Sequence, residues 1–276
     1  MTETFTFAMW LFTAIALLSL LALIAFARDQ QRKRLLVGIQ ILQAGRIMLV
    51  HLQKHRGLTS ARLSGITDKS SEILPLRDQV VADIAKLSAL SDWLSVNENW
   101  QGMTSHWAGL SVNCETMAAE DCFDQHSRLV VALLQLLGDA ANHFKVEENT
   151  RYTGTKVVWK EFLSMGEFIG QCRALGMQVL AGNLSADTRQ KYREMISGNL
   201  VIISMQLERN FCISNKQKQD VELFIAFVKA QIFEGLGVVS ASEYFNIASA
   251  TIDMVYDQFD SEMQRFHRKI SRVSQV

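Results

Sequence analysis

Residues 56–65 read RGLTSARLSG, and residues 173–182 read RALGMQVLAG. One Arg, two Leu and one Gly stand at the same four offsets in both segments. The segments are separated by about half of the chain that follows residue 27. Internal similarity of this kind indicates a duplicated structural unit. The pair therefore predicts two similar halves, with the repeated helix at an equivalent place in each.

The sequence around these segments has the apolar spacing of helices. From residue 35 to residue 62 there is no proline, and apolar side chains recur every three or four positions. No stretch alternates with a period of two, and one proline in 276 residues excludes Pro-rich linkers and turn-rich β-sandwiches. Further helices are expected from Ser70 or Ser71 to about Leu94, and at about 103–117, 120–146, 156–182, 186–213, 217–235 and 241–271.

Polar breaks separate these helices. TDKSSEILPLRD (67–78) and NENWQG (97–102) are interpreted as breaks, and ENTRYTGT (148–155) as the boundary between the two halves. The predicted fold class is all-α, with an N-terminal transmembrane helix followed by two packed up-down helical bundles. The expected divisions are a tail and transmembrane helix at 1–27, a first bundle at 28–150 and a second bundle at 151–276.

Residues 7–27 read FAMWLFTAIALLSLLALIAFA and contain no charge, proline or glycine. About 20 apolar residues span a bilayer core as a helix. A signal peptide would need a basic start and a shorter apolar core, whereas this one begins MTETFT. We therefore expect a retained single-pass anchor. Four basic residues follow it directly, so the positive-inside rule predicts a bacterial inner-membrane protein whose C-terminal side is cytoplasmic: Arg28, Arg32, Lys33 and Arg34.

Charge and motif content narrow the function. With 28 Lys+Arg against 28 Asp+Glu, the net charge is zero, and we expect no nucleic-acid partner. No phosphate-binding loop, dinucleotide-binding or nucleophile-elbow motif is present, so we expect no catalytic residue, no cofactor and no enzyme. His51 with His55 and Cys122 with His126 have the i,i+4 spacing that can hold a metal ion. No third ligand is identifiable for either pair, so we expect no metal site.

Arg56 and Arg173 lie on the apolar stripes of their expected helices, four residues after Leu52 and Ile169 respectively. A guanidinium buried between helices must be paired, because an isolated buried charge costs several kcal/mol. Its partner can be a carboxylate or a bound anion, and the planar donors of arginine suit a planar oxyanion. A structural ion pair, or a side chain that reaches out to solvent, is the alternative.

Three segments resemble motifs of the nitrate- and nitrite-sensing (NIT) domain family. LVHLQKHRGLTSARLSG (49–65) is similar to its opening helix, GQCRALGMQVLAGN (170–183) to its second arginine motif, and SEYFNIASATIDMV (242–255) to its closing helix. The resemblance implies two helical bundles and a nitrate or nitrite ion bound by arginines between them, at positions matching Arg56 and Arg173. Two positions differ from the family pattern: His55 replaces an acid, and Thr251 replaces an arginine.

The resemblance implies a membrane-anchored sensor of a small planar anion, nitrate or nitrite. The presence of Thr251 in place of the family's arginine would weaken anion binding by about 1.5–3 kcal/mol. No output module is recognisable, so the sensor is expected to act on a separate, unknown protein partner, with a homodimer as a further possibility. The alternative is a ligand-free membrane-anchored scaffold that recruits another protein. An open cavity between the arginines would favour sensing. Closed ion pairs between these arginines and a carboxylate such as Glu167, Glu194 or Asp253 would favour the scaffold.

Overall fold

The computed structural model describes residues 2–67, 70–148, 159–209, 213–235 and 239–272, and all regular structure in these ranges is helical. The first half contains α1 (Thr2–Leu63), η1 (Ser70–Glu72), α2 (Ile73–Ser88), α3 (Asp92–Ser95), α4 (Glu98–Asn113), η2 (Cys114–Thr116) and α5 (Ala119–His143). The second half contains α7 (Trp159–Ala181), α8 (Ala186–Arg209), α9 (Asn215–Val228), the π-helical turn η3 (Lys229–Phe233) and α10 (Ala241–Arg272). The predicted all-α class is confirmed.

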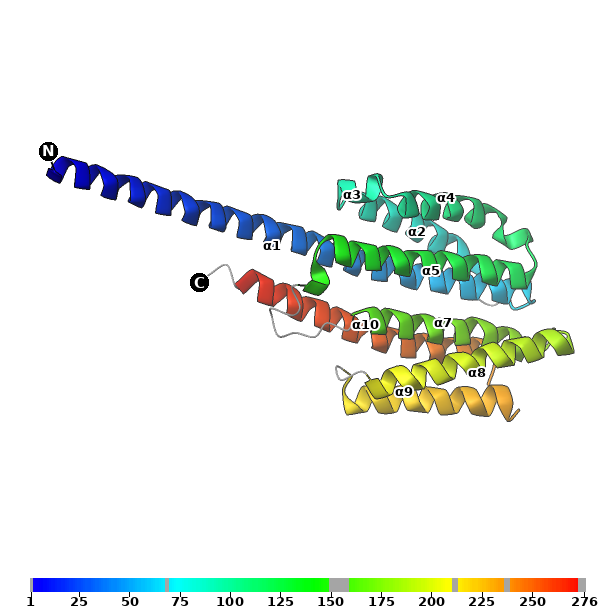
Figure 1. Cartoon of the computed structure of the whole chain (residues 1–276). Helices are drawn as coiled ribbons and strands as arrows, with labels where there is room; N and C mark the ends of the chain where they lie inside the picture. Colours follow the sequence, from blue (N-terminus) through cyan, green and yellow to red (C-terminus); the bar gives the residue numbers. More distant parts are fainter. Residues whose placement is uncertain (1, 68–69, 149–158, 210–212, 236–238, 273–276) are drawn as a thin grey trace.

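The helices form two up-down bundles that lie side by side (Figure 1). In the first, α1 packs against α2 and α5, and α4 covers α5; in the second, α7 packs against α8 and α10, and α9 completes the bundle. The two bundles meet where α1 contacts α7 and α10. The predicted boundary at 148–155 lies, apart from residue 148, outside the described residues.

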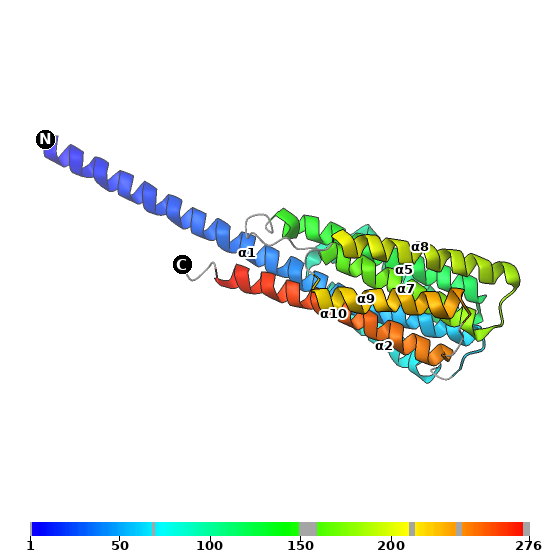
Figure 2. The ribbon, with the colours of Figure 1, turned by 90° about the horizontal axis from the view of Figure 1, so that it is seen from below.

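Helix α1 combines the apolar N-terminal segment with the central helix of the first bundle. Its most apolar 18-residue window has a mean hydropathy of 2.5, and none of that window is buried. From Leu35 onward the same helix contributes fully buried side chains such as Ile39 and Leu42. The protruding part of α1 and the C-terminal end of α10 lie at the same end of the molecule (Figure 2).

Two expectations for the first half are wrong. NENWQG (97–102) does not form a loop: the Asn97 side chain accepts a hydrogen bond from the Trp100 N–H and caps α4, which begins at Glu98. The helix expected to reach Leu94 ends at Ser88, and Ser91 caps the short α3. Both errors have one cause, because Asn and Ser are favoured at helix N-caps as well as in turns.

The repeated segments occupy equivalent places, at the C-terminal ends of α1 and α7. Gly65 and Gly182 follow these helices with φ of +90° and +79°. This left-handed conformation at a helix end favours glycine, which has no Cβ. The two ends are neighbours, since the Asn183 side chain donates a hydrogen bond of 3.1 Å to the Ser64 carbonyl. The second arginine-containing helix thus lies beside the first.

Two tyrosines of α10 pack against two glycines of α7 and fix the approach of these helices. A Cβ on Gly166 would lie 2.3 Å from the Tyr256 ring, and one on Gly176 would lie 2.4 Å from the Tyr244 ring. The buried Tyr244 hydroxyl donates to the Cys172 carbonyl at 3.0 Å. Since any larger residue would meet a ring, the glycines let α10 approach the helix that carries Arg173.

Candidate functional site

Helices α1 and α7 run parallel with a constant register. Gln53 bonds to Glu167, and Ser64 bonds to Gln178, and both pairs are 114 residues apart. Arg56 is therefore level with Gly170 of α7, whereas Arg173 is level with a residue three positions further along α1. At 1.5 Å per residue, the two arginines are staggered by about 4.5 Å along the helix axes.

Arg56 is fully buried and is neutralised by a carboxylate of the other bundle. Its Nη1 lies 2.6 Å from Glu167 Oε1 and its Nη2 lies 3.1 Å from Oε2, so the pair is bidentate. Nη1 also donates to Ser127 Oγ at 3.1 Å, and the guanidinium carbon lies 5.3 Å from the centre of the Phe123 ring. The absence of a side chain at Gly170 gives it room, since a Cβ there would be 3.2 Å from Nη2.

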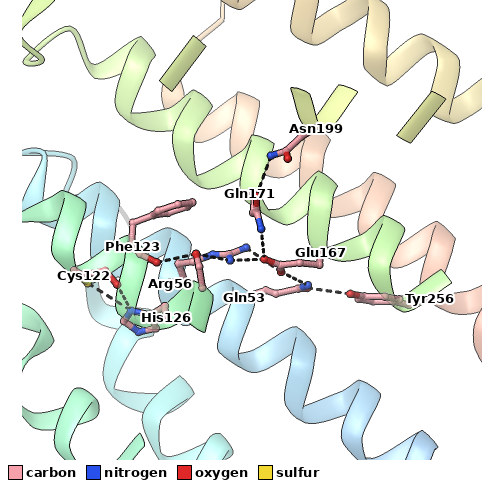
Figure 3. A network of polar contacts seen from close by, with 10 residues as sticks. Gln53, Arg56, Cys122, Phe123, His126, Glu167, Gln171, Asn199 and Tyr256 are labelled. Carbon is pink, nitrogen blue, oxygen red and sulfur yellow. Dashed lines mark hydrogen bonds and ion pairs between the residues drawn. The ribbon is translucent and has the colours of Figure 1, made fainter. Parts of the chain in front are cut away.

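Amide side chains from both helices hold the Glu167 carboxylate (Figure 3). Gln53 Nε2 donates to Oε2 at 2.9 Å, and Gln171 Nε2 donates to Oε1 at 2.8 Å. A further shell fixes these amides: Asn199 donates to Gln171 Oε1, and Tyr256 donates to Gln53 Oε1. Each carboxylate oxygen thus accepts one guanidinium and one amide N–H, in a network that spans α1, α7, α8 and α10.

Arg173 is buried to a similar depth but has a different environment. It is 4 % exposed, its Nη1 donates to Ser249 Oγ at 2.8 Å, and its guanidinium lies 4.7 Å from the Phe245 ring centre. Its Nε, like that of Arg56, has no hydrogen-bond partner in the part of the chain that the structure describes. No carboxylate of the described residues lies within 4.0 Å of it. Burial, followed by repulsion from Arg56, lowers the pKa of Arg173 to about 10.

The arginines are brought together at the crossing of α1 and α7, each beside a glycine of the opposing helix. A Cβ on Gly57 would be 3.7 Å from Arg173 Nε, which mirrors the contact between Gly170 and Arg56. Of the three carboxylates expected as possible partners, Glu167 alone pairs with an arginine of the site. Glu194 is exposed on α8 and accepts a hydrogen bond from Gln190. Asp253 is exposed on α10 and attracts Arg173 electrostatically, but it does not lie within ion-pair distance of it.

The residues with metal-ligand spacing have other roles. His51 pairs with Asp83 at 2.6 Å. His126 Nδ1 lies 2.7 Å from the Cys122 carbonyl and must donate to it, so its Nε2 accepts from His55 Nδ1 at 2.8 Å. Burial lowers the pKa of His55 to about 4 and that of His126 to about 3, which keeps both neutral. In the described parts of the chain, no group of three His, Cys, Asp or Glu side chains is placed to hold a metal.

Gln53 and Gln171 are the site residues that the sequence reasoning missed. Gln53 stands three positions before Arg56, and Gln171 stands two positions before Arg173, inside the quoted motifs.

A surface cavity of about 480 Å³ is lined by residues of α8 and η3, and neither arginine contributes to it.

A family model described as nitrate and nitrite sensing (NIT) matches residues 48–264, which include every residue of the network described above. The chain belongs to this family. Its NIT domain is also similar in structure to the NasR transcription antiterminator, with a TM-score of 0.65. That match has 18 % sequence identity and covers 94 % of this chain and 76 % of the other, so it shows a shared fold. No curated protein sequence matches this chain.

In this NIT domain the quoted motifs fall on α1, α7 and α10, the helices that meet at the boundary between the bundles. The position of the missing arginine, Thr251, is on α10; its side chain is 9 % exposed, and its hydroxyl donates to the Ile247 carbonyl at 3.1 Å. Thr251 therefore adds no charge to a site that already contains one arginine without a carboxylate partner.

Proposed function

We propose that this chain is a membrane-anchored sensor in which nitrate or nitrite is bound by Arg56 and Arg173. The observation that carries the proposal is the state of Arg173, a buried guanidinium with no carboxylate of the described residues at ion-pair distance. Buried charges are retained when they are paired or when they bind something. The family supplies the ligand class, since NIT domains are described as sensing nitrate and nitrite.

Membrane anchoring is supported by the exposed apolar end of α1 and by charge at its boundary. Exposed basic residues follow the apolar segment on α1 and occur again near the end of α10. An ion pair between Arg46 and Asp260 fixes these antiparallel helices in register, which places the end of α10 near residue 34 of α1. Basic side chains at this level would face a cytoplasmic membrane surface: Arg28, Lys33, Arg34, Arg265, Arg268 and Lys269.

A route for signalling follows from the same geometry. One arginine is on α1, which continues into the apolar segment, and the other is on α7 of the second bundle. An anion bound to both would favour one relative position of the two helices and so shift the equilibrium between positions. The shift would reach the membrane end of α1, or a separate protein partner docked on the bundles.

A second candidate function is a ligand-free membrane-anchored scaffold that recruits another protein. The closed, bidentate pair between Arg56 and Glu167 favours it, because this arginine already has a counter-charge. The two functions differ in whether the arginines respond to an added anion.

The test is thermal melting of the full-length chain in detergent, with nitrate, nitrite, chloride and sulfate at matched ionic strength. A ligand present at 100 times its dissociation constant adds about 2.7 kcal/mol of stability. For a protein of this size the melting temperature should rise by roughly 5–10 °C. A rise with nitrate or nitrite that is lost in Arg173→Gln supports the sensor. The same small response to all four anions would refute it and leave the scaffold.

A further inference from the structure

The donors around Glu167 form an arrangement suited to a planar oxyanion. Four N–H groups converge on the two carboxylate oxygens: two from Arg56, one from Gln53 and one from Gln171. A carboxylate presents two oxygens on one planar centre, and nitrate, with three oxygens, and nitrite, with two, can present the same pair. The four groups therefore supply the donor set that an external oxyanion would need, and a side chain of the protein itself occupies it.

We propose that Glu167 is a built-in competitor, which holds the anion position on Arg56 until nitrate or nitrite displaces it. This inference rests on the proposed function and deepens it, because it assigns the regulation of the same site. Both ends of the Arg56 fork are engaged by Glu167, at 2.6 and 3.1 Å. Arg56 Nε has no hydrogen-bond partner among the described residues, but an anion that is to take two hydrogen bonds from Nη1 and Nη2 must displace Glu167 from them.

Displacement is favoured over simple addition for an electrostatic reason. A second anion beside an intact Glu167 would place two negative groups close together in a buried site, where like-charge repulsion is strong. Exchange avoids this repulsion, and Gln53 and Gln171 can donate to the incoming oxygens as they did to the carboxylate. Displacement would also couple anion binding to the relative position of the two helices, because the ion pair between Arg56 and Glu167 directly links α1 to α7.

The experiment compares nitrate and nitrite binding to the full-length chain and to its Glu167→Gln variant, by isothermal titration calorimetry in detergent. Glutamine keeps the size of the side chain, but it removes the competing charge and replaces one of the two acceptor oxygens with an NH2 donor. Nitrate should bind about tenfold to a hundredfold more tightly, since a charge-assisted bidentate pair no longer has to be broken. Glu167→Asp, which keeps the charge but draws the carboxylate back from the fork, should also bind more tightly, by a smaller factor.

Glu262→Gln is the matched control. Glu262 is 2 % exposed, accepts a hydrogen bond from Gln258 and pairs with Arg265, so it resembles Glu167 in burial and partners. It lies on α10, however, and not on α7, which carries Glu167. Its removal should leave nitrate affinity unchanged. Circular dichroism confirms that each variant is helical, and Glu167→Asp remains informative if Glu167→Gln does not fold.

The outcomes separate the two proposals. Tighter binding in both Glu167 variants and not in the control supports the built-in competitor. Binding by the unchanged chain that stays equal or weakens in both variants overturns it, because Glu167 would then be a structural partner or a co-ligand, while the sensor remains. No binding of either anion to any of the proteins overturns the proposed function itself.

Discussion

The two buried arginines are expected to affect stability in opposite directions, although they lie at the same helix crossing. Arg56 has a bidentate carboxylate partner, whereas Arg173 has one hydroxyl acceptor and one aromatic ring. Replacing each with methionine removes the charge and keeps a long apolar side chain. We predict that Arg173→Met stabilises the protein in the absence of ligand and that Arg56→Met destabilises it.

The magnitudes follow from these contacts. Burying an ion costs several kcal/mol even after relaxation. Arg173 recovers about 1.5–3 kcal/mol from a charged hydrogen bond to Ser249 and about 0.5–2 kcal/mol from the ring of Phe245. Arg173→Met should therefore gain about 1–3 kcal/mol. Arg56→Met leaves the buried Glu167 without its cation and should lose about 3–5 kcal/mol.

The assay is thermal unfolding of the full-length chain followed by circular dichroism at 222 nm. A gluconate buffer without small inorganic anions keeps Arg173 from being neutralised by the medium. At about 2–4 °C per kcal/mol, Arg173→Met should melt roughly 2–12 °C higher than the unchanged chain, and Arg56→Met should melt lower. If Arg173→Met lowers the melting temperature as much as Arg56→Met does, the charge of Arg173 is compensated in the native protein and the reasoning is wrong.

Two further predictions concern stability away from the arginines. Because the native pKa values of His55 and His126, about 4 and about 3, lie below the unfolded value of about 6.5, the unfolded chain binds more protons between pH 4 and 6.5. The contribution of these two histidines to stability should therefore be constant above pH 7 and fall by up to about 2 kcal/mol per histidine from pH 6.5 to 5. Chemical denaturation should find this slope reduced in His126→Gln. Gly166→Ala should cost more than about 2 kcal/mol, because its Cβ would lie 2.3 Å from the Tyr256 ring. A Cβ on Gly198 of α8 would meet nothing within 4 Å, so Gly198→Ala should instead stabilise the protein by about 0.5–1 kcal/mol. Denaturant titrations measure both free energies of unfolding, and equal changes in the two variants would contradict this explanation.

The sequence predicted the helices well wherever apolar spacing and a strong terminator coincided. The helix expected to end at about residue 182 ends at Ala181, and Gly182 follows it with positive φ, as Gly65 does after α1. The prediction failed around Asn97, where one residue type serves both turns and helix caps. Periodicity could not separate these roles, because the difference lies in whether the side chain reaches the backbone N–H three residues later.

The arginines could be placed on buried stripes from sequence, but their partners could not be assigned. Apolar periodicity indicates which face of a helix is buried, but it does not indicate which residues of the neighbouring helix contact that face. Glu167, Glu194 and Asp253 were equally eligible in the sequence. The parallel register of α1 and α7, which makes Gln53 level with Glu167, decided among them. That register depends on contacts between residues 114 positions apart, which no local pattern records.

Under the proposed function, the charges of the buried network would explain how the site binds an anion without a third arginine. If Glu167 stays near the arginines after it has been displaced from the Arg56 fork, then Arg56, Arg173 and Glu167 together carry one net positive charge, and the nitrate or nitrite ion that has replaced it on Arg56 would neutralise that charge. An arginine in place of Thr251 would raise the excess to two and favour a divalent anion, or impose a larger burial cost when the site is empty. Sulfate, with two negative charges, would leave the present site with an excess negative charge. The difference between nitrate and sulfate in the melting experiment therefore measures this charge balance, and the difference between nitrate and chloride measures the fit of a planar ion to the arginine fork.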